Sequence, residues 1–394
     1  MNETGLLLTF EFPPYPGGIG TYSYQIARHF DSMGIDLWVA TKTSAEHFQD
    51  VATFDQGQPF PIYRFRPHNA RILKAVDRTL ETVNLCRRHN IRWIYCCSYN
   101  ASYIAAVCKQ LLGIPYFLAG YGTEFTTITP SKRYLLNQAT QVFVISRYTA
   151  GLIQDYCRRP VSVIPLGADE EHYDPARLSP DLVADVRQRY ARERGPVLLS
   201  VGRLNERKGH LTTVQALTQI KTHYPAVQLL IVGRSVSGSE DYEQTLRSYV
   251  RDSGLADNVA FIPVVTPDEL AALYSLADVF IMSSVEYKGD VEGFGIALIE
   301  ANLMETPVVA SRSGGIPDAV EEGASGLLYA PGNAAELAAQ TLTLLDNAAL
   351  RNALGKWGRT RALRSFTWSR VALQTWDVMA ERLPGLPPHH PPGA

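Results

Sequence analysis

Short runs of β-forming residues alternate with helical patterns along nearly the whole chain, and this alternation restricts the folds open to it. Amphipathic stretches, such as residues 21–33 and 100–112, separate the runs. The expected strands cover residues 6–10, 35–41, 93–96, 116–119, 141–145, 161–164, 197–201, 227–232, 259–262, 279–282, 307–310 and 326–329. Strands that alternate with helices of about 10–15 residues form βαβ units and parallel sheets. The sequence therefore predicts an α/β fold whose functional residues follow the carboxyl ends of strands.

The length of 394 residues favours two domains of roughly 150–200 residues each. Residues 165–180 are polar, rich in Pro and Asp, and without a long periodic run, so we place the boundary there. Residues 1–167 and 168–368 are then two doubly wound, Rossmann-like domains with a crevice between them. The Pro- and His-rich tail, residues 387–394, is expected to be disordered, with a metal role for His389 and His390 as the alternative.

The charge pattern excludes some classes of protein. The net charge is −2, which argues against a general nucleic-acid binder. Residues 1–167 carry a balance of +5 and the remainder −7, so the first half suits an anionic acceptor or a membrane surface, or else its arginines are simply solvated. The sequence shows no secretory signal and no apolar run of about 20 residues. Five cysteines without paired spacing are expected to be reduced core thiols of a cytoplasmic protein.

The first strand–helix junction is rich in glycine. Gly17, Gly18 and Gly20 would let the backbone approach a ligand, and the following helix offers its N-terminus to an anion. The pattern is close to a dinucleotide fingerprint, but the second strand is not followed by the acid that would hold a ribose. A nicotinamide or flavin site and a plain structural turn remain the alternatives.

The junction after the second domain's first expected strand carries two cations. Gly202, Arg203, Lys208 and Gly209 follow the strand at 197–201, and two cations at a helix entrance suit a diphosphate. The alternative is a loop with two solvated cations.

Residues 290–301 form the most informative junction. Gly293 and Gly295 flank Phe294 before an apolar helix, so the amides of Phe294, Gly295 and Ile296 are expected to face an anion. Glu292 and Glu300 lie on either side. Carboxylates only accept hydrogen bonds, so the pair suggests hydroxyl-rich groups such as a ribose and a sugar. A later Gly-Gly turn, Gly314 and Gly315, fits either a second phosphate or sugar contact or a tight turn.

Taken in order, these residues resemble the retaining family 4 glycosyltransferases, which have the GT-B fold. The likeness covers essentially the whole chain. It rests on Gly17-Gly18, on Gly202-Arg203 with Lys208-Gly209, on the spaced pair Glu292 and Glu300, and on Gly314-Gly315-Ile316-Pro317. It implies that the second domain binds a nucleotide-sugar donor and the first an acceptor. It also implies that the last helix, at about 369–386, crosses back to the first domain after Phe366-Thr-Trp368.

The resemblance assigns a role to each matched residue. Arg203 and Lys208 would hold and stabilise the leaving diphosphate. Glu292 would contact the donor sugar, and Glu300 the ribose hydroxyls. Phe294, Gly295 and Ile296 would bind sugar and phosphate through their amides, the segment at Val265 would read the base, and Gly17 and Gly18 would approach the phosphates.

The chain departs from the family at one position. Many members carry a His in the stretch that here reads residues 120–124, and Tyr121 stands in its place while Glu124 is kept. A phenol donates a hydrogen bond but is a poor base near neutral pH. We expect Tyr121 and Glu124 to line the sugar end of the crevice.

The resemblance implies a hexosyltransferase that moves a glucose- or mannose-type sugar from UDP-glucose or GDP-mannose to a hydroxyl of a glycan, lipid-linked or small-molecule acceptor, with retention. The alternatives are a GT-B nucleotide-sugar epimerase and a non-catalytic nucleotide-sugar binder. No cofactor or metal is expected, because the chain has no Asp-x-Asp. We expect a cytoplasmic enzyme, peripheral at the inner membrane face through its basic first domain.

Overall fold

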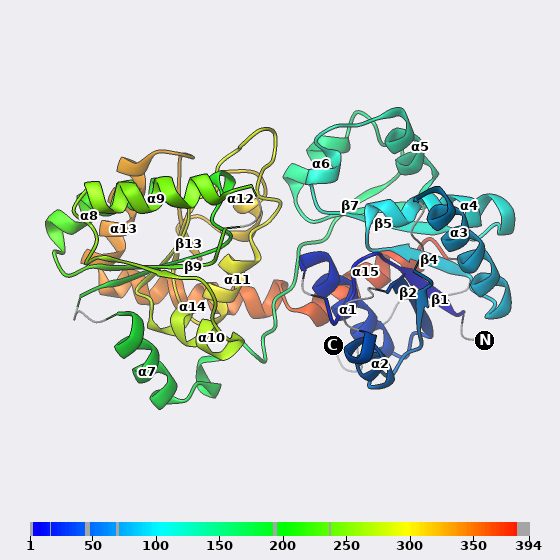
Figure 1. Ribbon diagram of the computed structural model, residues 1–394, viewed down its shortest axis with the longest axis horizontal. Coiled ribbons are helices and arrows are strands. Elements are labelled where there is room, and N and C mark those ends of the chain that lie inside the picture. Colours follow the sequence, from blue (N-terminus) through cyan, green and yellow to red (C-terminus); the bar gives the residue numbers. More distant parts are fainter. Residues whose placement is uncertain are drawn as a thin grey trace. The chain divides into compact units, whose positions relative to one another are not determined.

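The computed structural model describes residues 3–15, 17–43, 48–67, 71–191, 195–235 and 238–383, without the side chains of 48, 49 and 71–73. The predicted tail at 387–394 lies outside these residues. The chain divides into two compact units. One unit joins Met1–Leu166 to Trp368–Ala394, and the other is Gly167–Thr367. In Figure 1 the first is blue to cyan-green with a red final helix, and the second is green to orange.

The first unit is a parallel sheet covered by helices. Among the described residues, seven strands pair in the order β3-β2-β1-β4-β5-β6-β7. The strands are β1 (Gly5–Leu8), β2 (Leu37–Lys42), β3 (Ile62–Phe65), β4 (Trp93–Cys96), β5 (Tyr116–Gly120), β6 (Gln141–Val144) and β7 (Val161–Val163). The helices are α1 (Gly18–Ser32), α2 (Phe48–Gln56), α3 (Arg71–Arg88), α4 (Ser102–Leu112), α5 (Pro130–Gln138), α6 (Arg147–Ile153) and α15 (Trp368–Ala380).

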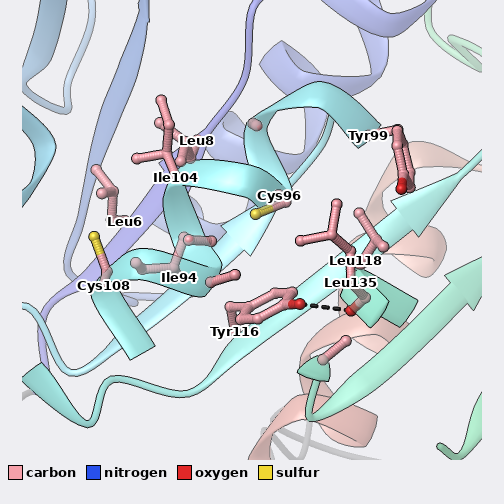
Figure 2. Close-up of a cluster of buried hydrophobic side chains, with 14 of the residues drawn as sticks. Leu6, Leu8, Ile94, Cys96, Tyr99, Ile104, Cys108, Tyr116, Leu118 and Leu135 are labelled. Atoms are coloured by element: carbon pink, nitrogen blue, oxygen red, sulfur yellow. Dashed lines mark hydrogen bonds between the residues drawn. The ribbon is translucent and has the colours of Figure 1, made fainter. Parts of the chain in front are cut away.

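Alternate strand residues of this sheet face opposite layers. Leu6, Ile94 and Leu118 belong to a buried cluster with Ile104 and Cys108 of α4 (Figure 2). The same cluster encloses the ring of Tyr116, whose hydroxyl donates to the carbonyl of Leu135 at 2.6 Å.

The opposite layer is aromatic and includes the last helix. Trp376 of α15 lies 5.6 Å, centroid to centroid, from both Phe30 of α1 and Trp93 of β4. Trp368, where α15 begins, contacts Tyr22 edge to face. The predicted return of the last helix to the first domain is therefore confirmed.

The second unit has the same architecture, a parallel sheet covered by helices. Among the described residues, six parallel strands pair in the order β10-β9-β8-β11-β12-β13. The strands are β8 (Val197–Val201), β9 (Gln228–Val232), β10 (Val259–Ile262), β11 (Val279–Met282), β12 (Val308–Ser311) and β13 (Gly326–Tyr329). The helices are α7 (Pro180–Tyr190), α8 (His210–His223), α9 (Glu240–Asp252), α10 (Pro267–Leu276), α11 (Ile296–Leu303), α12 (Ile316–Ala319), α13 (Ala334–Asp346) and α14 (Ala348–Ser365). One buried cluster joins Leu198, Ile231 and Ile281 to Leu217 of α8 and Leu337 of α13.

The predicted α/β class with two doubly wound domains is confirmed, and every expected strand is present within one or two residues of its predicted ends. The sequence pattern missed β3. This strand lies at the sheet edge, and of its four residues only Phe65 is buried. Its Arg64 bonds Asp55 at 2.7 Å and the carbonyl of Pro13 at 2.6 Å, so a charged residue interrupts the apolar signal.

All five cysteines are free, and all but Cys157 are buried, as expected of core thiols. In the part of the chain that the structure describes, no helix combines the length and apolarity needed to cross a bilayer.

Candidate functional site

The two charged junctions of the second unit meet because of the strand order. The sheet runs from β8 to β9 and β10 on one side, and from β11 to β12 and β13 on the other. The loops that follow β8 and β11 therefore leave neighbouring strands in opposite directions. Such a switch point is where open α/β sheets bind ligands.

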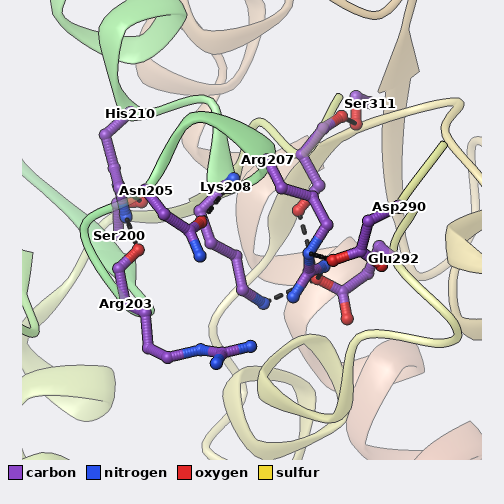
Figure 3. A network of polar contacts seen from close by, with 10 residues as sticks. Ser200, Arg203, Asn205, Arg207, Lys208, His210, Asp290, Glu292 and Ser311 are labelled. Atoms are coloured by element: carbon purple, nitrogen blue, oxygen red, sulfur yellow. Dashed lines mark hydrogen bonds and ion pairs between the residues drawn. The ribbon is translucent and has the colours of Figure 1, made fainter. Parts of the chain in front are cut away.

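Glu292 joins the two loops. Its Oε2 accepts a hydrogen bond from Lys208 Nζ at 2.6 Å, from Arg207 Nη1 at 2.8 Å and from Ser284 Oγ at 3.2 Å. Arg207 also lies 3.0 Å from Asp290 Oδ2 through its Nε. Figure 3 shows both cations pointing from the β8 loop toward the two acids. The network brings the predicted residues Lys208 and Glu292 into direct contact.

The electrostatics of Glu292 follow from this contact. Its side chain is only 13% exposed, and burial alone would raise its pKa. The charges of Lys208 and Arg207 outweigh burial and lower the pKa of Glu292 to about 2. Glu292 is therefore a carboxylate at neutral pH, and it can only accept hydrogen bonds.

The β8 loop is fixed by a short helical turn, Glu206–Lys208. Asn205 caps it, because its Oδ1 accepts from the Lys208 amide at 3.2 Å. Gly209 follows at φ +64°, and a Cβ there would lie 1.9 Å from the carbonyl oxygen of Ser283. Only glycine allows the β8 loop to approach the β11 loop this closely.

His210 contacts both β8 and the loop that precedes the turn. Its ring nitrogens lie 3.2 Å from Ser200 Oγ and 3.2 Å from the carbonyl of Arg203. Burial, together with the charge of Lys208, lowers the pKa of His210 to about 4, so the ring is neutral at neutral pH.

The Gly-Gly turn after β12 holds the backbone of Glu292. The Gly315 amide donates to the Glu292 carbonyl at 2.9 Å. At Gly314, with φ +55°, a Cβ would lie 2.2 Å from that same carbonyl oxygen. In this structure the turn therefore positions Glu292.

The N-terminus of α11 presents backbone donors. Gly295, at φ +90°, precedes the helix without a side-chain cap. Within the described residues the amides of Ile296 and Ala297 have no acceptor. The Phe294 ring is buried against Phe366, at 5.6 Å, so Phe294 offers a ligand only its backbone. Free amides at a helix N-terminus suit an anion.

Glu300 lies one turn into the same helix and accepts from two phenols. Tyr274 OH donates to its Oε2 at 2.8 Å, and Tyr173 also bonds its side chain. Burial raises the pKa of Glu300, and the hydrogen bond from Tyr274 opposes that shift. The two phenols fix the orientation of this carboxyl group.

Other predicted residues form no hydrogen bond or ion pair with the Glu292 side chain within the described residues. Arg203 is exposed, its guanidinium extends in Figure 3 toward the side on which Lys208 and Glu292 lie, and it has no ion-pair partner among the described residues. A Cβ added at Gly202, which has φ +158°, would lie 3.3 Å from Cδ of Lys208. Val265 is half-buried in the loop between β10 and α10, beside the exposed Val264.

In the first unit, Gly17 and Gly18 lie where α1 begins, and a Cβ on Gly18 would meet nothing within 4 Å. Tyr121 and Glu124 follow β5 and contact each other. The Tyr121 amide donates to Glu124 Oε1 at 2.5 Å, and the Tyr121 hydroxyl donates to the Cys97 carbonyl at 2.7 Å. The phenol proton is thus already used, so only the phenol oxygen remains to accept from a ligand.

Three residues of the site were absent from the sequence prediction. Arg207 looked like any surface arginine, yet it is 8% exposed and bonded to two acids. Tyr173 and Tyr274 are distant in sequence from Glu300 and gave no signal. The only sequence signal for Arg207 was its position between two other charged residues, Glu206 and Lys208.

Two family descriptions match the chain. "Glycosyltransferase Family 4" matches residues 16–172, and "Glycosyl transferases group 1" matches residues 184–361. Together they span both units.

Curated relatives match over nearly full length. The chain is 32% identical to a GDP-mannose-dependent alpha-(1-6)-phosphatidylinositol monomannoside mannosyltransferase of Mycolicibacterium smegmatis, covering 96% of this chain and 98% of the relative. It is 29% identical to the protein of the same name from Mycobacterium tuberculosis, covering 95% and 97%.

Solved structures share the fold. A glycosyltransferase from Rickettsia africae superposes with a TM-score of 0.84 at 17% identity, covering 98% of this chain and all of that one. Anabaena HepE in complex with UDP superposes with a TM-score of 0.81 at 22% identity, covering 96% of this chain and all of that one.

Proposed function

The chain belongs to the family 4 glycosyltransferases, enzymes that use a nucleotide sugar, and on that premise we propose that it is a mannosyltransferase that uses GDP-mannose. We propose as acceptor a hydroxyl of an inositol-phosphate glycolipid. Both parts are supported by the full-length relatives, whose names specify GDP-mannose and phosphatidylinositol monomannoside.

The observation that best supports the proposed donor site is the network of cations and acids at the β8–β11 switch point. Lys208 and the free amides at Ile296 and Ala297 supply donors suited to a diphosphate. Exposed Arg203 lacks an ion-pair partner among the described residues and would supply a second cation. Glu300 would accept from the ribose hydroxyls and Glu292 from the sugar.

The proposed reaction retains the configuration of the sugar. The bond from sugar C1 to the diphosphate oxygen breaks, and the acceptor oxygen bonds C1 on the same face. The acceptor proton goes to the departing diphosphate. Lys208 and Arg203 would stabilise the negative charge that develops on the diphosphate, and fixed charges of this kind are a large term in catalysis.

The transfer is proposed to need no divalent metal, because the cations would do that work. Turnover in excess EDTA should equal turnover in Mg²⁺. Loss of activity in EDTA that Mg²⁺ or Mn²⁺ restores would refute this part of the proposal.

The test of the donor and acceptor is an incubation with each candidate pair. The enzyme is offered GDP-mannose or UDP-glucose, together with phosphatidylinositol monomannoside or with no acceptor, and products are identified by mass spectrometry. We expect one hexose to be added to the glycolipid from GDP-mannose alone. Transfer from UDP-glucose only would overturn the donor assignment.

The incubation without acceptor tests the alternatives. Conversion of the donor sugar to its epimer would indicate an epimerase. Binding of GDP-mannose without turnover on any hydroxyl acceptor would indicate a non-catalytic binder.

A further inference from the structure

A second cationic site lies in the first unit, along α5. An open groove of about 580 Å³ is lined by Pro130, Arg133, Tyr134, Asn137, Arg158 and Arg159. The α5 members recur every three or four residues and so share one helix face. Arg158 and Arg159 precede β7, at the amino end of that strand, whereas Tyr121 follows the carboxyl end of β5. The groove is therefore distinct from the strand–helix junctions described above.

Asn137 holds the two walls of the groove together. Its Oδ1 accepts from the Arg158 amide at 2.8 Å, and its Nδ2 donates to the Tyr156 carbonyl at 2.8 Å. Its own carbonyl accepts from Arg159 Nε at 2.7 Å. The backbone of Arg158 and the guanidinium of Arg159 are thus bonded to Asn137 of α5.

The cations of the groove have no acidic partners. Arg133, Arg158 and Arg159 are exposed, and across the described residues no carboxylate lies within 4.0 Å of any of them. Lys109, on the neighbouring α4, donates to the Gln138 carbonyl at 2.5 Å. Burial lowers the pKa of Lys109, and the charge of Arg159 lowers it further. Four cations thus gather without a counter-charge, which favours an anion.

We propose that this groove binds a phosphate group, held by Arg133, Arg158 and Arg159. Guanidinium groups present paired donors that match phosphate oxygens, and three of them suit a doubly charged anion. The Tyr134 hydroxyl, which accepts from Gln110 at 2.6 Å, adds a polar group at the same wall. The phosphate belongs either to a lipid headgroup or to a free phosphorylated molecule.

The variant that tests the proposal is Arg133→Gln with Arg158→Gln. Neither side chain forms a hydrogen bond or ion pair within the described residues, so the fold should be kept, and Arg159 retains its bond to Asn137. The matched control is Arg87→Gln with Arg88→Gln, an exposed adjacent pair at the end of α3 that removes the same charge from the same unit.

The first measurement is hydrogen exchange of the full chain with and without inorganic phosphate, at low salt. We expect phosphate to slow exchange at residues 133–138 and 156–160 in the native chain and the control. In the groove variant the apparent Kd for phosphate should rise roughly tenfold or more. No protection in the native chain, or equal protection in the groove variant, would overturn the proposal.

The second measurement identifies the source of the phosphate. The chain is sedimented with phosphatidylcholine vesicles that contain or lack phosphatidic acid. Co-sedimentation that needs phosphatidic acid and is lost only in the groove variant supports a lipid headgroup. Phosphate protection without vesicle binding supports a free phosphorylated molecule. Vesicle binding that the control loses and the groove variant keeps would place any lipid contact elsewhere and refute the headgroup source.

Discussion

At the scale of single residues, the candidate site depends on one carboxylate that holds two cations. Glu292 lies between Lys208 and Arg207, and these contacts keep it charged although it is largely buried. Glu292 and Lys208 were predicted from their strand–helix junctions, whereas Arg207 was not. Their meeting was not predicted, because it depends on which strands are neighbours in the sheet.

Replacing Lys208 by Ala should lower kcat by about 10²-fold or more, since the lost charge acts on the diphosphate as it leaves. Arg207 still pairs Glu292, so the fold should be retained. Steady-state kinetics and circular dichroism provide the measurement. Lys221→Ala, at a half-buried lysine whose Nζ donates to the Gly254 carbonyl, is the control. An unchanged kcat in Lys208→Ala would contradict the role.

Glu300→Gln should instead weaken donor binding, by roughly tenfold, and leave kcat almost unchanged, because a ribose contact is similar in the ground and transition states. Titration calorimetry with GDP and steady-state kinetics separate the two effects. Tyr274→Phe, which removes one of the phenols that orient Glu300, should shift binding in the same direction by less. A fall in kcat with intact GDP affinity would argue against this role.

Glu292 should also contribute to stability in a pH-dependent way. Its pKa falls from 4.5 to about 2 on folding, so its contribution is complete above pH 4.5 and is lost as the pH drops toward 2. The full contribution is about 3 kcal/mol at most. The free energy of unfolding of the native chain and Glu292→Gln, measured by urea titration from about pH 5 to pH 3, should converge as the pH falls.

Glu206→Gln is the control for this comparison, since Glu206 lies in the same turn and forms no ion pair within the described residues. If the difference in the free energy of unfolding between the native chain and Glu292→Gln does not change with pH, Glu292 has an ordinary pKa.

At the scale of elements, strands were more predictable than the contacts between loops. The buried strand β11 is a continuous apolar run and β8 is interrupted only by Ser200, so their positions follow from the sequence alone. The edge strand β3 was missed because Arg64 and exposure erase that pattern. The contacts of Tyr173 and Tyr274 with Glu300 were not predicted, because the three residues come from separate segments of the chain. The local sequence pattern thus predicts which segments are buried and where turns lie. Which side chains contact each other depends on the order of the strands in the sheet.

The last helix should matter to the stability of the first unit. Trp376 of α15 is 5% exposed and contacts Phe30 and Trp93. Trp376→Ala should lower the free energy of unfolding by about 3–5 kcal/mol. Urea denaturation measures the change. Trp357→Ala, a 47% exposed tryptophan on α14, should change it by less than about 0.5 kcal/mol. Equal effects would mean that α15 adds little to this core.

At the scale of the whole molecule, each unit encloses its own buried cluster, so a ligand of one unit should protect that unit first. GDP at about 100 times its Kd should stabilise the state that binds it by about 2.7 kcal/mol. Hydrogen exchange should slow at residues 202–209 and 283–297, around the site, more than in the strands of the first unit. Protection concentrated in β1 and β4 would contradict the placement of the donor site.

The return of α15 to the first unit has a consequence for biosynthesis. When the ribosome has finished residues 1–166, the aromatic layer of Phe30 and Trp93 still lacks the helix that covers it. The whole of the second unit must be translated before Trp376 leaves the exit tunnel. The domain that is made first is therefore completed last, and its uncovered tryptophan and phenylalanine face is what a nascent-chain chaperone would meet in the interval.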